Sequence, residues 1–198
     1  MNSELRAVRH EDILLLALEH PNGLPRLERR VLREFARQME ILASTHELTG
    51  AVITGIPQAF CAGAELTEIN SLLASETLDF AREGQRVMDQ IEHSAKPVVA
   101  AIHGYCMGGG FDLALACRVR ICSRDAIFAH RGASLGLITG WGGTQRLPRL
   151  IGRSRAMEIF LTGRMIAADE ALAIGLVREV AASNQVMQQV IAHARSAP

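Results

Sequence analysis

Three consecutive glycines, Gly108 to Gly110, constrain this chain more than any other stretch of its sequence. They come shortly after an apolar run from Pro97 to Ile102, and a compact apolar segment with Asp112 in its first turn follows them. This order is typical of a buried strand, a tight loop and a helix that begins on glycine, because glycine allows positive φ angles and close approach to the main chain. Free N–H groups at such a helix start favour an anion or a developing oxyanion.

Strands and helices alternate along the chain. Predicted strands cover residues 12–18, 50–54, 98–103, 119–122, 126–129 and 176–180. Predicted helices, marked mainly by apolar residues at steps of three and four, cover residues 24–42, 77–93, 113–117, 154–161, 167–174 and 184–194. We expect loops over residues 60–66 and 135–152. The alternation favours an α/β fold with right-handed crossovers, and with no internal repeat or linker in view we expect one domain over residues 1–198.

The composition is that of a globular protein, with 48% hydrophobic and 21% charged residues, which argues against disorder. Lys and Arg together number 21, as do Asp and Glu, so no net field indicates a nucleic-acid partner. A local cluster of basic residues is interpreted as a solvated helix face. Its members are Arg26, Arg29, Arg30 and Arg33.

The cysteines form no C-x-x-C pair, so we expect buried thiols in a reducing cytoplasm and neither a metal site nor disulfides. They are Cys61, Cys106, Cys117 and Cys122. The segment Met1 to His10 is charged and lacks the apolar core of a signal peptide. No apolar run approaches the roughly 20 residues that span a bilayer. We therefore expect a cytoplasmic protein with no membrane partner.

The loops over residues 60–66 and 104–110 each follow a predicted buried strand, so they are expected to converge on a crevice at the carboxyl ends of those strands. Main-chain N–H groups from both loops could then form an oxyanion hole. The alternative is that the glycines serve only tight turns and close helix packing. Asp112 is likewise open to two interpretations, a general acid–base group or a helix-start carboxylate that accepts from N–H groups.

Three further stretches are weaker candidates. The sequence GASLG, Gly132 to Gly136, matches the G-x-S-x-G elbow of serine hydrolases, but the glycines after it argue against the required helix. His130 and Arg131 could contact an acidic ligand or have an ordinary loop role. The sequence GWGG, Gly140 to Gly143, lacks the full dinucleotide-binding pattern.

Three motifs, taken together, resemble the crotonase family, also called the enoyl-CoA hydratase/isomerase family. They are AFCAGAEL (residues 59–66), AAIHGYCMGGGFDLALACRVRI (100–121) and LGLITGWGGTQRLPRLIG (135–152). A later stretch, TGRMIAADEALAIGLVREV (162–180), also resembles the family's continuation. The resemblance implies the α/β fold of the family, a superhelix (spiral) of ββα units, here with a shortened C-terminal helical segment.

The resemblance also implies an acyl-CoA thioester substrate, as in fatty acid metabolism, with no cofactor beyond that coenzyme A. Its enolate would be stabilised by the main-chain N–H groups of Ala64 and Gly109. Coenzyme A would be bound by Ala62, Glu65 and Leu66 as well as by Ala64 and Gly109. The family's assemblies imply a homotrimer or hexamer.

Three positions depart from the family's hydratases, which hold a water molecule between two glutamates. Asp112 stands at the first of these positions and Gly132 at the second, and Arg118 replaces a further aspartate. A single shortened acid suits proton shuttling in an isomerase or enolate stabilisation, so efficient hydration is not expected. Two alternatives remain: a non-catalytic acyl-CoA-binding or subunit-interaction protein, and another crotonase reaction such as decarboxylation or thioester hydrolysis.

Overall fold

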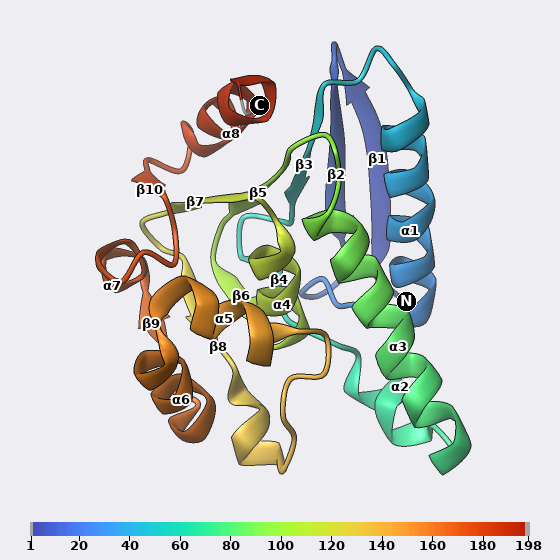
Figure 1. The fold of residues 1–198 in the computed structure, drawn as a ribbon, viewed down its shortest axis with the longest axis vertical. Helices are drawn as coiled ribbons and strands as arrows, with labels where there is room; N and C mark the ends of the chain where they lie inside the picture. The colour runs from blue at the N-terminus through green and yellow to red at the C-terminus, as the bar shows by residue number, and fades with distance from the viewer. Residues whose placement is uncertain (1, 197–198) are drawn as a thin grey trace.

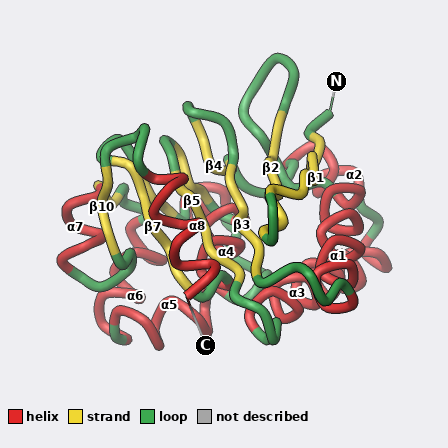
Figure 2. The backbone as a smooth tube through the Cα atoms, turned by 90° about the horizontal axis from the view of Figure 1, so that it is seen from above, coloured by secondary structure: helices red, strands yellow, loops and turns green. Residues whose placement is uncertain are grey.

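The main sheet of the protein has six strands in the order β1-β2-β3-β5-β7-β10 (Figure 2). A computed structural model describes residues 2–196. The strands are β1 (Glu4–His10), β2 (Ile13–Glu19), β3 (Gly50–Thr54), β5 (Val98–Ile102), β7 (Val119–Ser123) and β10 (Glu179–Ala181). Every neighbouring pair is parallel except β1 and β2, which form an antiparallel hairpin. The predicted α/β class is therefore confirmed.

A second, smaller sheet has the order β4-β6-β8-β9. Its strands are β4 (Ala59–Cys61), β6 (Tyr105–Met107), β8 (Ile127–Ala129) and β9 (Ile166–Ala167). Along the chain, β3 leads into β4, β5 into β6 and β7 into β8, and helical structure follows each pair (Figure 1). This succession of ββα units is the spiral architecture that the resemblance implies.

The helices lie on both faces of the main sheet. They are α1 (Arg29–Ser44), α2 (Leu66–Ser71), α3 (Ala74–Glu92), α4 (Gly109–Ala116), α5 (Gly143–Ile151), α6 (Arg153–Thr162), α7 (Ala168–Ala173) and α8 (Val186–Ser196), with a 3₁₀ turn η1 (Arg131–Leu135). Figure 2 shows α8 across one face of the sheet and α1 and α3 on the other. Because successive strand residues face opposite sides, Val52 joins the α8 cluster, while Ala51 and Ile53 join the larger core.

Two N-terminal elements differ from the expectation. Strand β1 was not expected, because its charged residues hide a two-residue alternation in which Leu5 and Ala7 pack on the core. Charged side chains are a common feature of strands at the edge of a sheet. The predicted helix over residues 24–42 begins only at Arg29, because Leu27 pairs its main chain with Ala64 in a parallel bridge.

Three further differences from the sequence-based prediction need correction. The predicted loop over residues 135–152 contains helix α5, whose Arg146, Leu147 and Ile151 are buried on one face. The predicted strand over residues 176–180 pairs with β7 only over residues 179–181, since the N–H of Leu176 bonds instead to the carbonyl of Ala171. Short elements such as α2 and β9 were not predicted.

All four cysteines are free and buried, as expected. Burial raises the pKa of the Cys61 thiol to about 12. No helix among residues 2–196 is long and apolar enough to cross a membrane.

Helix α4 begins in direct contact with β4. A Cβ atom on Gly110 would lie 2.5 Å from the carbonyl oxygen of Cys61 and 2.6 Å from its Cβ atom. Only glycine therefore lets α4 approach β4 this closely. This approach places the start of the helix beside the loop that follows β4.

We expect Gly110→Ala to lower the free energy of unfolding by about 1–3 kcal/mol, because the added methyl group forces β4 and α4 apart. Urea denaturation measures this change. Gly140→Ala is the control, because a Cβ atom at that exposed glycine meets no atom within 4 Å. Equal stability of the two variants would contradict the close packing of α4 on β4.

Candidate active site

A cavity of about 360 Å³ lies where three segments meet: the loop after β4, the start of α4 and the stretch after β8. The two loops predicted to converge therefore line one cavity. Its wall is largely apolar, with Leu72 and Phe80 on one side and Ile138 on another. The titratable side chains among its lining residues are those of Arg26, Asp112, His130 and Arg131.

Two main-chain N–H groups lie close together among the residues that line this cavity. Among residues 2–196, no protein acceptor takes the N–H of Ala64 or of Gly109. A Cβ atom on Gly109 would lie only 3.3 Å from the nitrogen of Ala64, so the two groups are neighbours. Positive φ angles of +108° at Gly63 and +50° at Gly108 turn the chain before each group, which explains the need for glycine there.

The loop after β4 is held by hydrogen bonds to the segment before α1. Ala62 N–H donates to the carbonyl of Pro25 at 2.8 Å, and Leu27 N–H donates to that of Gly63 at 2.8 Å. Glu65 N–H then donates to the carbonyl of Leu27 at 3.1 Å. These bonds fix the loop on both sides of Ala64 while leaving its own N–H free. The sequence analysis did not identify the segment before α1 as a support for this loop, because main-chain pairing in a loop leaves no periodic pattern of side chains.

The residues expected to bind coenzyme A do not all line the cavity. Ala62, Ala64 and Leu66 do, as does Gly109. Glu65 does not line it: its carboxylate accepts from the N–H of Thr67 at the start of α2, and it pairs with Arg26 at 3.2 Å. Its side chain therefore holds the loop in place.

Asp112 is among the residues that line the cavity and is 1% exposed. Its Oδ2 atom accepts hydrogen bonds from the hydroxyl of Thr139 and from the N–H of Trp141, the latter at 3.3 Å. Burial raises the pKa of Asp112 to about 6, and these hydrogen bonds together with the charge of Arg146 limit the rise. Its Oδ1 atom is fully buried and has no hydrogen-bond partner among residues 2–196.

His130 lies beside Asp112 and is buried, which corrects the expectation of an ordinary loop position. Its Nε2 atom is 3.5 Å from Oδ1 of Asp112. Its ring stacks on Phe111, with centroids 4.7 Å apart, and contacts Phe160 at 5.2 Å. This surrounding lowers the pKa of His130 to about 4, because burial disfavours the charged ring. Only proximity in the fold reveals the pair, since 17 positions separate the two residues.

The competing motifs do not form the structures that their patterns would require, in agreement with the sequence arguments against them. The stretch GASLG forms the 3₁₀ turn η1, where the hydroxyl of Ser134 donates to the carbonyl of Arg131 at 2.7 Å and stays exposed. This stretch therefore does not form a nucleophile elbow. The GWGG stretch leads into α5 and carries Trp141, whose N–H contacts Asp112.

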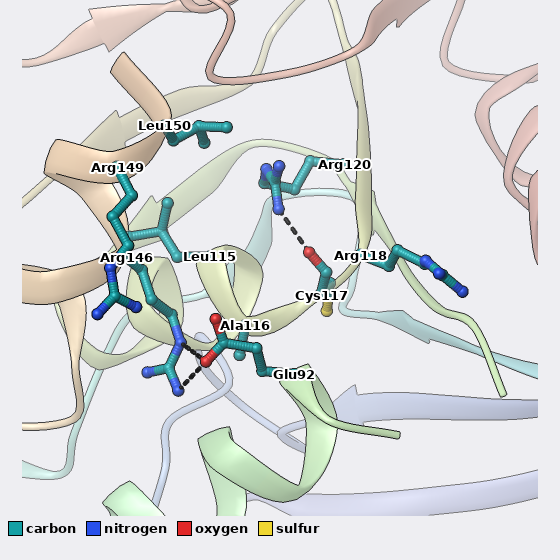
Figure 3. Close-up of a pocket in the computed structure, with 9 residues that line it drawn as sticks. All are labelled: Glu92, Leu115, Ala116, Cys117, Arg118, Arg120, Arg146, Arg149 and Leu150. Carbon is teal, nitrogen blue, oxygen red and sulfur yellow. Dashed lines mark hydrogen bonds and ion pairs between the residues drawn. The ribbon is translucent and has the colours of Figure 1, made fainter. Parts of the chain in front are cut away.

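A second hollow, of about 270 Å³, is lined by four arginines, but two of them serve the fold (Figure 3). Arg120 donates to main-chain carbonyls, including that of Leu176 at 2.8 Å, and Arg146 pairs with Glu92 at 2.7 Å. Arg118, which stands where the family has an aspartate, points away from the other arginines in Figure 3. Neither Asp112 nor His130 lines this hollow.

Comparisons with known proteins all indicate the enoyl-CoA hydratase/isomerase family. A family model described as enoyl-CoA hydratase/isomerase matches residues 9–197. The chain is 38% identical over 187 residues to YngF of Bacillus subtilis, whose name places it among the enoyl-CoA hydratase/isomerases, covering 94% of this chain and 72% of YngF.

Solved structures agree. An enoyl-CoA hydratase from Bacillus anthracis has a TM-score of 0.90 at 32% identity, covering 98% of this chain and 75% of that one. DspI of Pseudomonas aeruginosa has a TM-score of 0.92 at 32% identity, covering 96% of this chain and 72% of that one. The expected crotonase fold is confirmed.

The opposite pKa changes of Asp112 and His130 predict opposing effects of pH on stability. The pKa of Asp112 rises from 3.8 to about 6 on folding, so its contribution is present below pH 3.8 and is lost as the pH rises through 6. The pKa of His130 falls from 6.5 to about 4, so its contribution is present above pH 6.5 and is lost as the pH falls through 4.

We therefore expect the two contributions to offset each other between pH 4 and pH 6 in the unmodified protein. Asp112→Asn leaves the His130 contribution, so its free energy of unfolding should gain about 2–3 kcal/mol relative to the unmodified protein as the pH rises across this range. The free energy of unfolding of His130→Phe should fall by a similar amount relative to the unmodified protein over the same pH range. Urea denaturation at several pH values measures both. Parallel pH profiles for all three proteins would contradict the assigned pKa directions.

Proposed function

This chain belongs to the enoyl-CoA hydratase/isomerase family, and we propose that it is an enzyme that activates an acyl-CoA thioester as its enolate. One observation carries the proposal: two free main-chain N–H groups and a buried carboxyl group line the same cavity. The N–H groups are suited to donate hydrogen bonds to the thioester oxygen. The carboxyl group is suited to accept a proton from the neighbouring carbon atom.

The N–H groups of Ala64 and Gly109 form the proposed oxyanion hole. When a proton leaves the carbon next to the thioester carbonyl, negative charge develops on the carbonyl oxygen. Two donors already in place stabilise that charge without reorganisation, and loss of one such donor typically lowers a rate by about 10²–10³-fold. Gly109 is also the first residue of α4, so the positive end of the helix dipole adds to the effect.

Asp112 is the proposed proton-transfer group. With a pKa near 6, it is mostly a carboxylate at neutral pH and is a stronger base than an ordinary aspartate. Among the residues that line the cavity, it is the only carboxylate. Its Oδ2 atom is fixed by Thr139 and Trp141, so the carboxyl group keeps a defined position.

The remaining lining residues fit the two ends of the proposed substrate. Arg26 and Arg131 line the cavity and offer positive charge to the phosphates of coenzyme A, although Arg26 is partly neutralised by Glu65. Apolar residues such as Leu72, Phe80 and Ile138 offer surface to an acyl chain.

We expect Asp112→Asn to lower the rate of α-proton exchange of a bound acyl-CoA by at least about 10²-fold, because an amide cannot accept the proton. Exchange is measured by mass spectrometry after incubation with a panel of acyl-CoA thioesters in heavy water. Asp125→Asn is the matched control, since Asp125 is exposed and does not line the cavity.

Exchange that is equally fast in the Asp112→Asn variant would contradict the role of Asp112. Saturable binding of acyl-CoA with no exchange in the unmodified protein would instead support a non-catalytic binding protein. Release of carbon dioxide or of free coenzyme A thiol in the same incubation would reveal decarboxylation or thioester hydrolysis.

A further inference from the structure

The side chain of Trp141 packs between helices α3 and α4 beside the cavity. Trp141 is 4% exposed and lines the cavity together with Phe80 of α3, and the centroids of the two ring systems are 5.5 Å apart. A Cβ atom on Gly109, the first residue of α4, would lie 2.5 Å from Cζ3 of the indole. The six-membered ring of the indole therefore packs directly on the start of α4.

A glycine inside α3 accommodates the other end of the indole. A Cβ atom on Gly84 would lie 2.2 Å from Nε1 of Trp141 and 2.4 Å from its Cδ1 atom. Gly84 lies in the interior of α3, where glycine makes a helix less stable than alanine does. The close contact with the indole accounts for a glycine at this position. Both helices thus make room for Trp141.

The lining residues of α3 show where the cavity ends. Phe80 and Ala81 line it, whereas Gly84, almost one helical turn further along, does not. The next residue, Gln85, lines instead a neighbouring hollow of about 590 Å³. The cavity therefore ends along α3 at the point where Gly84 contacts the indole of Trp141.

The stretch that carries Trp141 forms the wall between the two spaces. Of residues 2–196, only Gly140 and Trp141 line both the cavity and the neighbouring hollow. The side-chain amide of Gln85 donates to the carbonyl of Gly140 at 2.8 Å, which ties the wall to α3. The indole is the large side chain of this wall, because the other residue that lines both spaces is a glycine.

The indole lies beside the proposed position of the thioester. The N–H of Gly109 is one of the two donors proposed for the thioester oxygen, and the indole packs on this same residue. An acyl chain begins at the thioester carbon, so its first carbon atoms would lie near the indole. Burial of each methylene group in an apolar space is favourable. Protein interiors are closely packed, so a chain that reaches the indole has no free space beyond it.

We propose that Trp141 closes the acyl end of the cavity, so that the protein acts on short-chain acyl-CoA thioesters and excludes long unbranched chains. The inference rests on the proposed acyl-CoA function and adds a substrate class to it. A longer chain would have to displace an indole that is held between two helices, or leave the cavity past exposed side chains such as that of Ile138.

The test measures chain-length preference as the ratio of kcat/KM for α-proton exchange of butanoyl-CoA to that of decanoyl-CoA in heavy water. For the unmodified protein we expect a ratio of at least about 10², because even one methylene group in an apolar pocket can change kcat/KM by about tenfold or more. Trp141→Ala should lower the ratio by at least about tenfold, because the space of the indole then opens toward the neighbouring hollow. The variant keeps the main-chain N–H that contacts Asp112.

A second variant guards against loss of folding in Trp141→Ala. Trp141→Phe keeps an aromatic ring against Phe80 and removes the other ring, so it should lower the ratio in the same direction by a smaller factor. Tyr105→Ala is the control, because Tyr105 is an aromatic residue that is 42% exposed and does not line the cavity. Its ratio should equal that of the unmodified protein. Thermal unfolding checks that each variant is folded.

Two results would overturn the inference. One is equal kcat/KM for the two thioesters in the unmodified protein, and the other is an unchanged ratio in the folded Trp141 variants. Absence of exchange with every acyl-CoA of the panel would instead overturn the proposed function on which the inference rests.

Discussion

The close approach of two main-chain segments is the constraint on which the site depends. The loop after β4 meets the start of α4 at the contact between Cys61 and Gly110, and this contact brings the N–H groups of Ala64 and Gly109 together. Side chains larger than hydrogen would separate the segments. The ββα succession explains how this contact arises, because β4 and β6 pair in the second sheet and carry the two loops to the same place.

Burial gives the two polar groups of the cavity their complementary chemistry. The same exclusion of water raises the pKa of Asp112 and lowers that of His130, so the carboxylate becomes a better base while the imidazole stays neutral. Thr139 and Trp141 hold one carboxylate oxygen and leave the other beside the histidine ring.

Much of the fold could be predicted from the sequence, because long apolar periods and glycine positions report local structure. The strands at Gly50–Thr54 and Val98–Ile102 and the helix α3 show this. Features set by contacts between distant segments were missed. The main chain of Leu27 bonds to the loop around Ala64, and the folded chain brings His130 beside Asp112. Neither contact leaves a pattern along the sequence. The three ββα units also share no sequence repeat, since their helical parts differ in length and burial.

In the proposed function, the N–H groups of Ala64 and Gly109 polarise the thioester carbonyl of a bound acyl-CoA. Infrared difference spectroscopy with a ¹³C-labelled thioester carbonyl tests it directly, because hydrogen bonds to the oxygen weaken the C=O bond. We expect the carbonyl band to shift to lower frequency on binding, relative to the free thioester in water. A bound thioester whose carbonyl band does not shift to lower frequency would contradict it.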